Sequence, residues 1–225
     1  MKQELKKALR DTVPVFSGYL VLGMGFGILM QTKGYGVLWT LAMSAFIYAG
    51  SMQYLAVDLL CAGASLPSAA LTTLLVNARH LFYGISMVDR YKGAGKKKPY
   101  MIFALTDETY SLVCDGEKSH RYAFLVSLFN QIWWVGGSVL GALVGSFLPA
   151  ALTEGIDFAL TALFVTVFVE QWKSTKDHLP AIIGVLASVA SLLLFGAENF
   201  LIPAMVLITA ALLVLRAVRK EAHHG

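Results

Sequence analysis

Long apolar stretches follow one another along almost the whole chain. A membrane helix needs about 20 mostly apolar residues to cross a hydrocarbon core of about 30 Å. A soluble α/β protein would instead show shorter buried runs separated by charged helix faces. The pattern predicts an all-α integral membrane protein, a bundle of about six to eight transmembrane helices. We place eight apolar segments, at about 13–32, 37–60, 66–88, 99–114, 122–149, 157–172, 179–196 and 199–216.

Composition agrees with this pattern. Of the 225 residues, 57% are hydrophobic and only 14% are charged, and the mean hydropathy is +0.66. This leaves too little polar surface to coat a soluble protein of this size. Since no loop exceeds about a dozen residues, we expect a single transmembrane domain over 1–225, with short cytoplasmic tails at 1–12 and 217–225.

The basic residues give an orientation and point to an unusual region. The net charge of +4 does not indicate a nucleic-acid partner, because the basic residues flank apolar segments, at 2–10, 90–98, 173–176 and 216–220. Such clusters are expected in the cytoplasm. Eight full crossings would place 89–98 outside, unless 66–88 and 99–114 both enter and leave on the cytoplasmic side. We therefore expect broken or re-entrant segments around 66–114 of a multi-pass protein of the cell membrane; a single tolerated violation of the charge rule is the alternative.

The segment at 66–88 carries polar residues in mid-run. Leu74–Gly84 reads LLVNARHLFYG and contains Asn77, Arg79 and His80. A charge in mid-membrane costs about 2.5–3.5 kcal/mol on the insertion scale. On a continuous helix Asn77 and His80 share a face and Arg79 points nearly opposite to Asn77, so one cavity could receive all three only if the helix unwinds. The alternative is that Arg79 reaches the cytoplasmic headgroups.

The segment at 99–114 contains LTDETY, with Thr106, Asp107, Glu108 and Tyr110. A carboxylate here could pair with the arginine of the preceding segment, bind a substrate ammonium or carry a proton. The alternative is structural: Thr106 or Asp107 begins a short helix at the membrane surface.

Two further patterns concern the backbone and helix packing. YAGSMQY at 48–54 places Gly50 and Ser51 where a helix could unwind, and Gln53 could contact substrate or hydrogen-bond another helix. The segment at 122–149 contains a ladder of small residues that lets a helix of this chain or of a partner approach closely. Its members are Gly137, Gly141 and Gly145.

No hydrolase, P-loop or metal-ligand motif occurs in the sequence. We therefore expect a secondary transporter rather than an enzyme, with no metal and no cofactor. A membrane scaffold subunit that stabilises another membrane protein is the alternative, with the polar clusters then serving helix association.

Five short motifs together resemble the AzlC family of branched-chain amino acid permeases, and the resemblance covers about residues 10–215. The motifs are Pro14 with Gly18, the Gly23–Gly27 stretch, AGSMQ at 49–53, VNARHLFYG at 76–84 and LTDETY at 105–110. One departure is Ala78, where the usual motif has a larger residue, so the substrate preference could differ.

The resemblance carries expectations about function. It implies the large subunit of an exporter of valine, leucine, isoleucine and sometimes methionine, coupled to protons and acting with a small membrane subunit of the AzlD type. It also implies functional roles in substrate binding or coupling for eight polar positions, Gln53, Asn77, Arg79, His80, Thr106, Asp107, Glu108 and Tyr110.

Overall fold

The computed structural model describes residues 2–114, 119–149 and 158–224, and every regular element in these ranges is helical. The chain forms two compact units, Met1–Phe164 and Val165–Gly225. The prediction of an all-α protein is confirmed. The prediction of one membrane domain over 1–225 stays a prediction.

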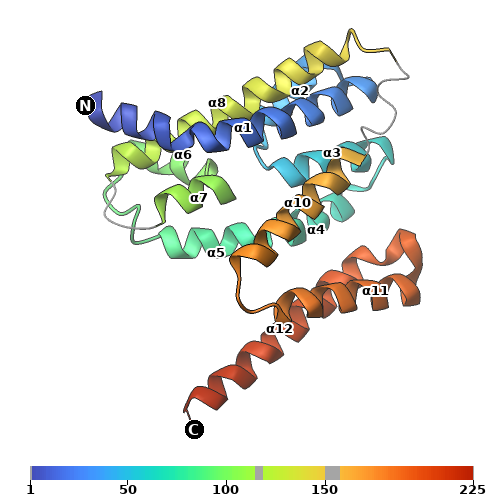
Figure 1. Ribbon diagram of the computed structural model, residues 1–225. Coiled ribbons are helices and arrows are strands. Elements are labelled where there is room, and N and C mark those ends of the chain that lie inside the picture. The colour runs from blue at the N-terminus through green and yellow to red at the C-terminus, as the bar shows by residue number, and fades with distance from the viewer. Residues whose placement is uncertain (1, 115–118, 150–157, 225) are drawn as a thin grey trace. The chain divides into compact units, whose positions relative to one another are not determined.

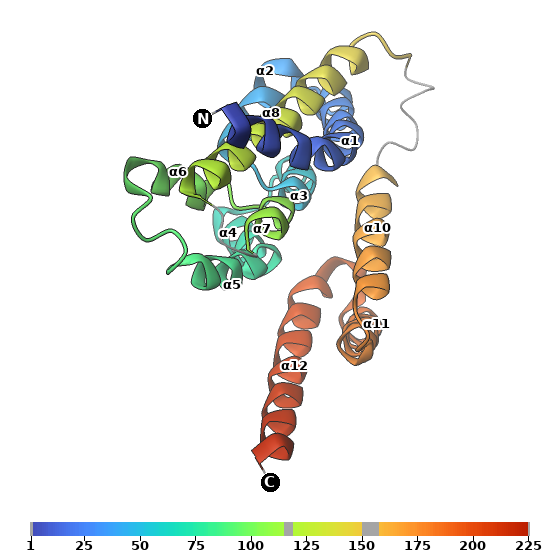
Figure 2. The ribbon, with the colours of Figure 1, turned by 60° about the vertical axis from the view of Figure 1, so that its left-hand side comes forward.

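Two long helices, α1 (Lys2–Thr32) and α8 (His120–Gly145), form the framework of the first unit. They lie side by side in both ribbon views (Figure 1, Figure 2) and make the most extensive helix contact of the unit. The contact has no room for side chains on its glycines: a Cβ on Gly137 would lie 2.7 Å from the Tyr19 carbonyl oxygen, and one on Gly141 would lie even closer to that of Met24. The glycine ladder at 137, 141 and 145 therefore faces α1 of the same chain.

The apolar segment expected at 37–60 forms two helices, α2 (Gly36–Phe46) and α3 (Gly50–Cys61). Gly50 and Ser51, where we expected the break, are the first two residues of α3, and the break itself lies just before them. Tyr48, between α2 and α3, lies in the left-handed region, with φ 46°. This conformation costs a residue with a side chain on the order of 1–3 kcal/mol, and such strain is often found at functional sites.

Residues 66–114 are broken twice more. The first pair of helices is α4 (Leu66–Val76) and α5 (Ala78–Met87), which meet at Asn77. The second pair, α6 (Lys98–Phe103) and α7 (Asp107–Val113), follows a 3-10 turn, η1 (Gly95–Lys97). At 1.5 Å per residue, the 6 residues of α6 and 7 of α7 together extend only about 20 Å, less than the hydrocarbon core.

The prediction of broken segments around 66–114 is thus confirmed, and their re-entrant course stays a prediction. Three helices in the described residues are long and apolar enough to cross a membrane, by length and composition: Lys2–Thr32, His120–Gly145 and Leu179–Gly196.

The second unit contains a helical hairpin of α11 (Leu179–Asn199), kinked at Gly196, and α12 (Leu201–His224). The helix α10 (Phe158–Ser174) precedes it and runs through the boundary between the units. Outside the apolar part of the hairpin, Arg219 pairs with the exposed Asp177, two residues before α11 begins. The hydrogen bond from Arg219 lowers the pKa of the Asp177 carboxyl.

Candidate functional site

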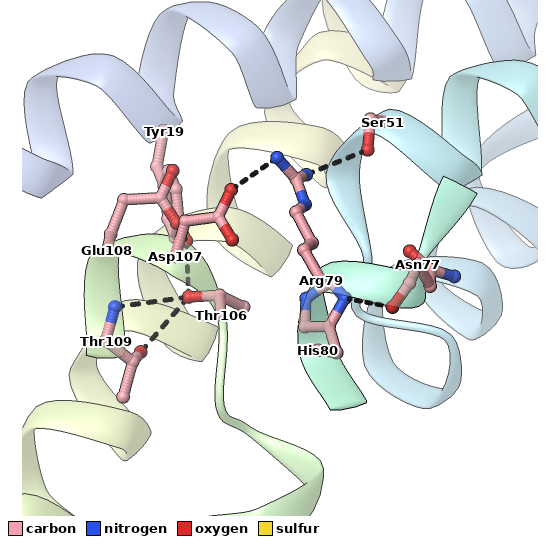
Figure 3. A network of polar contacts seen from close by, with 9 residues as sticks. All are labelled: Tyr19, Ser51, Asn77, Arg79, His80, Thr106, Asp107, Glu108 and Thr109. Carbon is pink, nitrogen blue, oxygen red and sulfur yellow. Dashed lines mark hydrogen bonds and ion pairs between the residues drawn. The ribbon is translucent and has the colours of Figure 1, made fainter. Parts of the chain in front are cut away.

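A polar centre lies where three of the short helices begin (Figure 3). Arg79, in the first turn of α5, forms an ion pair with Asp107, the first residue of α7, with 2.7 Å between Nη1 and Oδ2. Its Nη2 donates a 3.3 Å hydrogen bond to Ser51 Oγ in the first turn of α3. The guanidinium therefore joins the beginnings of α3, α5 and α7, which come from three different apolar segments.

The ion pair is only partly shielded from its surroundings. The Arg79 side chain is 35% exposed and that of Asp107 is 33% exposed. Among the described residues, the Arg79 Nε has no hydrogen-bond partner although it is buried. Each charge offsets part of the other's cost of lying within an apolar segment. The Nε–H of the guanidinium is therefore a donor that these contacts leave unused.

A second polar chain links α7 to the long helices. Tyr19 of α1 donates a 2.6 Å hydrogen bond to Glu108 Oε2, and its hydroxyl lies 3.0 Å from Thr106 Oγ1. The Thr106 hydroxyl contacts that of Thr109 at 3.2 Å, and Asn130 of α8 donates to the Thr109 hydroxyl at 3.0 Å. The start of α7 is thus held by both α1 and α8.

Thr106 is also the N-cap of α7, because its Oγ1 accepts a 3.3 Å hydrogen bond from the Thr109 amide. The structure therefore contains both the helix cap and the ion pair that we considered for LTDETY. Thr106 begins the helix, as the structural alternative supposed, and Asp107 pairs with Arg79. The other interpretation of Arg79, a side chain reaching for the headgroups, does not describe this structure.

Asn77 and His80 line a pocket beside this centre. The His80 Nδ1 lies 3.3 Å from the Asn77 carbonyl oxygen across the break between α4 and α5. The pocket has a volume of about 420 Å³ and extends between residues of the α2–α3 break, α5 and α6. Arg79 is not part of its wall, since its side chain points to Asp107 instead. Unwinding at Asn77 therefore does not bring all three residues into one cavity.

Gln53 and Tyr110 contact residues outside the polar centre and the pocket. Gln53 is fully buried; its Nε2 donates to Ser44 Oγ at 3.2 Å, and Trp134 Nε1 donates to its Oε1 at 2.9 Å. Its amide thus connects α2, α3 and α8, which is the interhelical alternative. The Tyr110 ring stacks on that of Tyr83, with centroids 4.4 Å apart.

Sequence reasoning missed Tyr19, Ser51 as a partner of the arginine, and Thr109. The partner of Tyr19 lies 89 residues away in the sequence, so no local spacing could have indicated it. The only available signal was a hydroxyl within a glycine-rich apolar helix. Within residues 2–114, 119–149 and 158–224, no group of three His, Cys, Asp or Glu side chains is placed to hold a metal ion.

Known proteins resemble this chain over most of its length. Residues 14–148 match the family described as AzlC protein. The branched-chain amino acid transport protein AzlC of Bacillus subtilis is 44% identical over 216 residues, which are 94% of this chain and 85% of that protein. An uncharacterized membrane protein of Helicobacter pylori (strain 26695) is 42% identical over 95% of this chain and 97% of its own length.

A more distant relative is the inner membrane protein YgaZ of Escherichia coli, 31% identical over 80% of this chain and 79% of that protein. No solved structure matches the chain. The family match spans more than half of the chain, and the Bacillus subtilis relative aligns over 85% of its own length. The chain therefore belongs to the AzlC protein family.

Proposed function

We propose that this chain is the large subunit of a secondary transporter that exports branched-chain amino acids, namely valine, leucine and isoleucine, with methionine as a further candidate. The transport class is supported by the 44% identity to the Bacillus subtilis branched-chain amino acid transport protein. This relationship indicates a membrane transporter rather than an enzyme.

One observation carries the proposal: the Arg79–Asp107–Ser51 centre joins three helices at their first turns. Secondary transporters bind their substrates at broken helices near the middle of the membrane, where helix ends supply unpaired backbone groups. A scaffold would need neither the breaks nor polar side chains in contact at all three of them. Polar side chains inside apolar segments are costly, and they mark substrate or ion pathways in membrane proteins.

Proton coupling is the second part of the proposal. A proton taken up by Asp107 removes its charge and with it the ion pair to Arg79, so the junction of α5 and α7 can open. Glu108 lies beside it and is held by the Tyr19 hydroxyl, and His80 follows Arg79 in the first turn of α5. These three titratable groups are our proposed relay.

The test is counterflow of labelled valine in proteoliposomes, measured as a function of pH, with the chain alone and with a co-expressed small AzlD-type subunit. The variants are Asp107→Asn and His80→Ala. Asp89→Asn is the matched control, because the Asp89 side chain is 85% exposed and pairs with neighbouring Lys92 on the surface. We expect valine movement in the wild type and the control, and a loss of its pH dependence in Asp107→Asn.

Two results would contradict the proposal in different ways. If neither preparation moves a branched-chain amino acid, export is wrong. If valine moves and both variants keep the wild-type pH dependence, export stands and the relay is wrong.

We also propose that the protein lies in the cytoplasmic membrane with both termini in the cytoplasm. The basic segment at 90–98 supports this orientation if the broken helices enter and leave on that side. In a chain with Cys61 and Cys114 replaced by serine, Gly95→Cys tests it. A membrane-impermeant thiol reagent added to intact cells should leave residue 95 unmodified, and modification would overturn the re-entrant course.

A further inference from the structure

We infer that the pocket beside the polar centre is the amino acid site, and that Gly84 sets which side chains it accepts. This inference rests on the proposed transport function. The pocket, of about 420 Å³, lies within the range of about 300–1,000 Å³ typical of small-molecule sites. Its place near the small end of that range suits a single amino acid better than a peptide.

One end of the pocket can hold the charged groups of an amino acid. Asn77 lines the pocket, and its buried Oδ1 has no hydrogen-bond partner among the described residues, so a small rotation of the side chain can present it to a ligand. A carbonyl oxygen only accepts, so the contact between His80 Nδ1 and the Asn77 main-chain oxygen places the hydrogen on Nδ1. In the neutral ring, Nε2 is then an acceptor. Two acceptors in one wall match the donors of a substrate ammonium.

The carboxylate has a place next to the ammonium. Ala49, which lines the pocket, precedes α3 and supplies no side-chain cap to its first turn. The first amides of a helix carry partial positive charge and bind anions. The hydrogen bond between Arg79 and Ser51, 3.3 Å long, holds this turn of α3 beside the start of α5. The first amides of α3, which are donors, therefore lie near the acceptors of Asn77 and His80. The two charged groups of an amino acid zwitterion need such neighbouring partners.

Most of the remaining wall is apolar and continues along α5. His80, Gly84, Met87 and Val88 follow one another on one helix face, and Leu105 also lines the pocket. A substrate held at His80 would direct its side chain over Gly84, one turn further. A Cβ built on Gly84 meets no atom within 4 Å, so this glycine keeps space open without being required by packing. The free space fits a branched aliphatic side chain.

Lys98 also lines the pocket. It belongs to the basic segment that the charge pattern assigns to the cytoplasm. An exporter loads its substrate from that side.

The test is equilibrium binding of labelled leucine and labelled alanine to the full-length protein in nanodiscs, with the small subunit co-expressed. Gly84→Leu should weaken leucine binding by about tenfold or more and alanine binding far less, since a leucine in the pocket fills the side-chain space. Gly84→Ala should weaken leucine binding by an amount between those of the wild type and Gly84→Leu. Gly136→Leu is the matched control, because a Cβ at Gly136 of α8 also meets nothing within 4 Å and this residue does not line the pocket.

A second arm uses 4-methylpentanoate, which is leucine without its ammonium group. Asn77→Ala should weaken leucine binding about tenfold and leave competition by 4-methylpentanoate unchanged. A variant that fails to fold would lose all ligands together, whereas the proposal requires a change in their ratio.

An unchanged leucine-to-alanine ratio in Gly84→Leu, in a protein that still moves leucine in proteoliposomes, would overturn the pocket assignment and leave the transport function standing. If the wild type neither binds nor moves any branched-chain amino acid, both proposals fall.

Discussion

The α1–α8 pair and the beginnings of α3, α5 and α7 make helix contacts in opposite ways. The long helices touch backbone to backbone through glycines, which leaves no freedom to slide or separate without breaking contact. The short helices touch through one ion pair and a few hydrogen bonds at partly exposed side chains. A contact of the first kind has one arrangement, and a contact of the second kind can be opened by a proton or a ligand.

The difference assigns separate tasks to the two regions. Tyr19 of α1 and Asn130 of α8 hold the start of α7 from the fixed side. Trp134 of α8 holds α3 through Gln53. The long helices therefore serve as the frame, and movement during transport is expected at the helix breaks, where a few residues can absorb it.

The largest effect should follow from a side chain placed between the long helices. In Gly141→Ala, the new Cβ would overlap the backbone of α1 at Met24. Because backbone cannot yield as a flexible side chain can, we expect a loss of about 2–3 kcal/mol in the free energy of unfolding. Denaturant titration of the protein in detergent measures it.

Gly136→Ala is the control for this substitution. It lies on the same helix, and its Cβ would meet no atom within 4 Å. Equal destabilisation by both substitutions would show that helix propensity or lipid contact, rather than contact with α1, governs the result.

The next effect concerns the ion pair at the breaks. Arg79→Ala leaves the Asp107 carboxylate without its partner, and we expect it to lower the unfolding free energy by about 1–2 kcal/mol, a value discounted because both side chains are about a third exposed. Transport of valine should fall more than tenfold.

The double variant Arg79→Ala with Asp107→Ala separates stability from function. Removing both charges should restore most of the lost stability and none of the transport. A double-mutant cycle on unfolding free energies measures the coupling. Additive losses would mean that the two side chains do not stabilise each other.

A smaller effect is expected at the N-cap of α7. Thr106→Val removes the oxygen that accepts from the Thr109 amide, and a lost cap costs about 1 kcal/mol. Thr106→Ser keeps the oxygen and should retain both stability and transport. If Thr106→Val is as stable as the wild type, the cap does not contribute to stability.

Much of the site could be predicted because charges inside apolar segments are expensive. Arg79, His80, Asp107 and Glu108 stand out in the sequence for that reason alone, and the breaks at 66–114 followed from their placement and from the basic segment between them. The partnership of Arg79 with Asp107 was one of several possibilities, since sequence spacing does not fix contacts between segments.

Other features could not be predicted from local sequence. The break before α3 lies at Tyr48 rather than at Gly50, because the left-handed residue between α2 and α3 is not the glycine that such positions favour. The hydrogen bonds of Gln53 depend on how α2, α3 and α8 pack, which no spacing within 48–54 reveals.

The smallest effect is expected at the ion pair of the second unit, which repeats the chemistry of Arg79 and Asp107 in an exposed place. Arg219 lowers the pKa of Asp177, so the stabilisation is present above the pKa of the unfolded carboxyl and is lost as the pH falls through the lower pKa of the folded protein. Exposed pairs are screened by water and salt, and at neutral pH Asp177→Asn should leave the melting temperature and valine transport unchanged within error. Loss of transport in this variant, to the extent seen in Asp107→Asn, would show that the partly shielded position of the first pair is not what makes it functional.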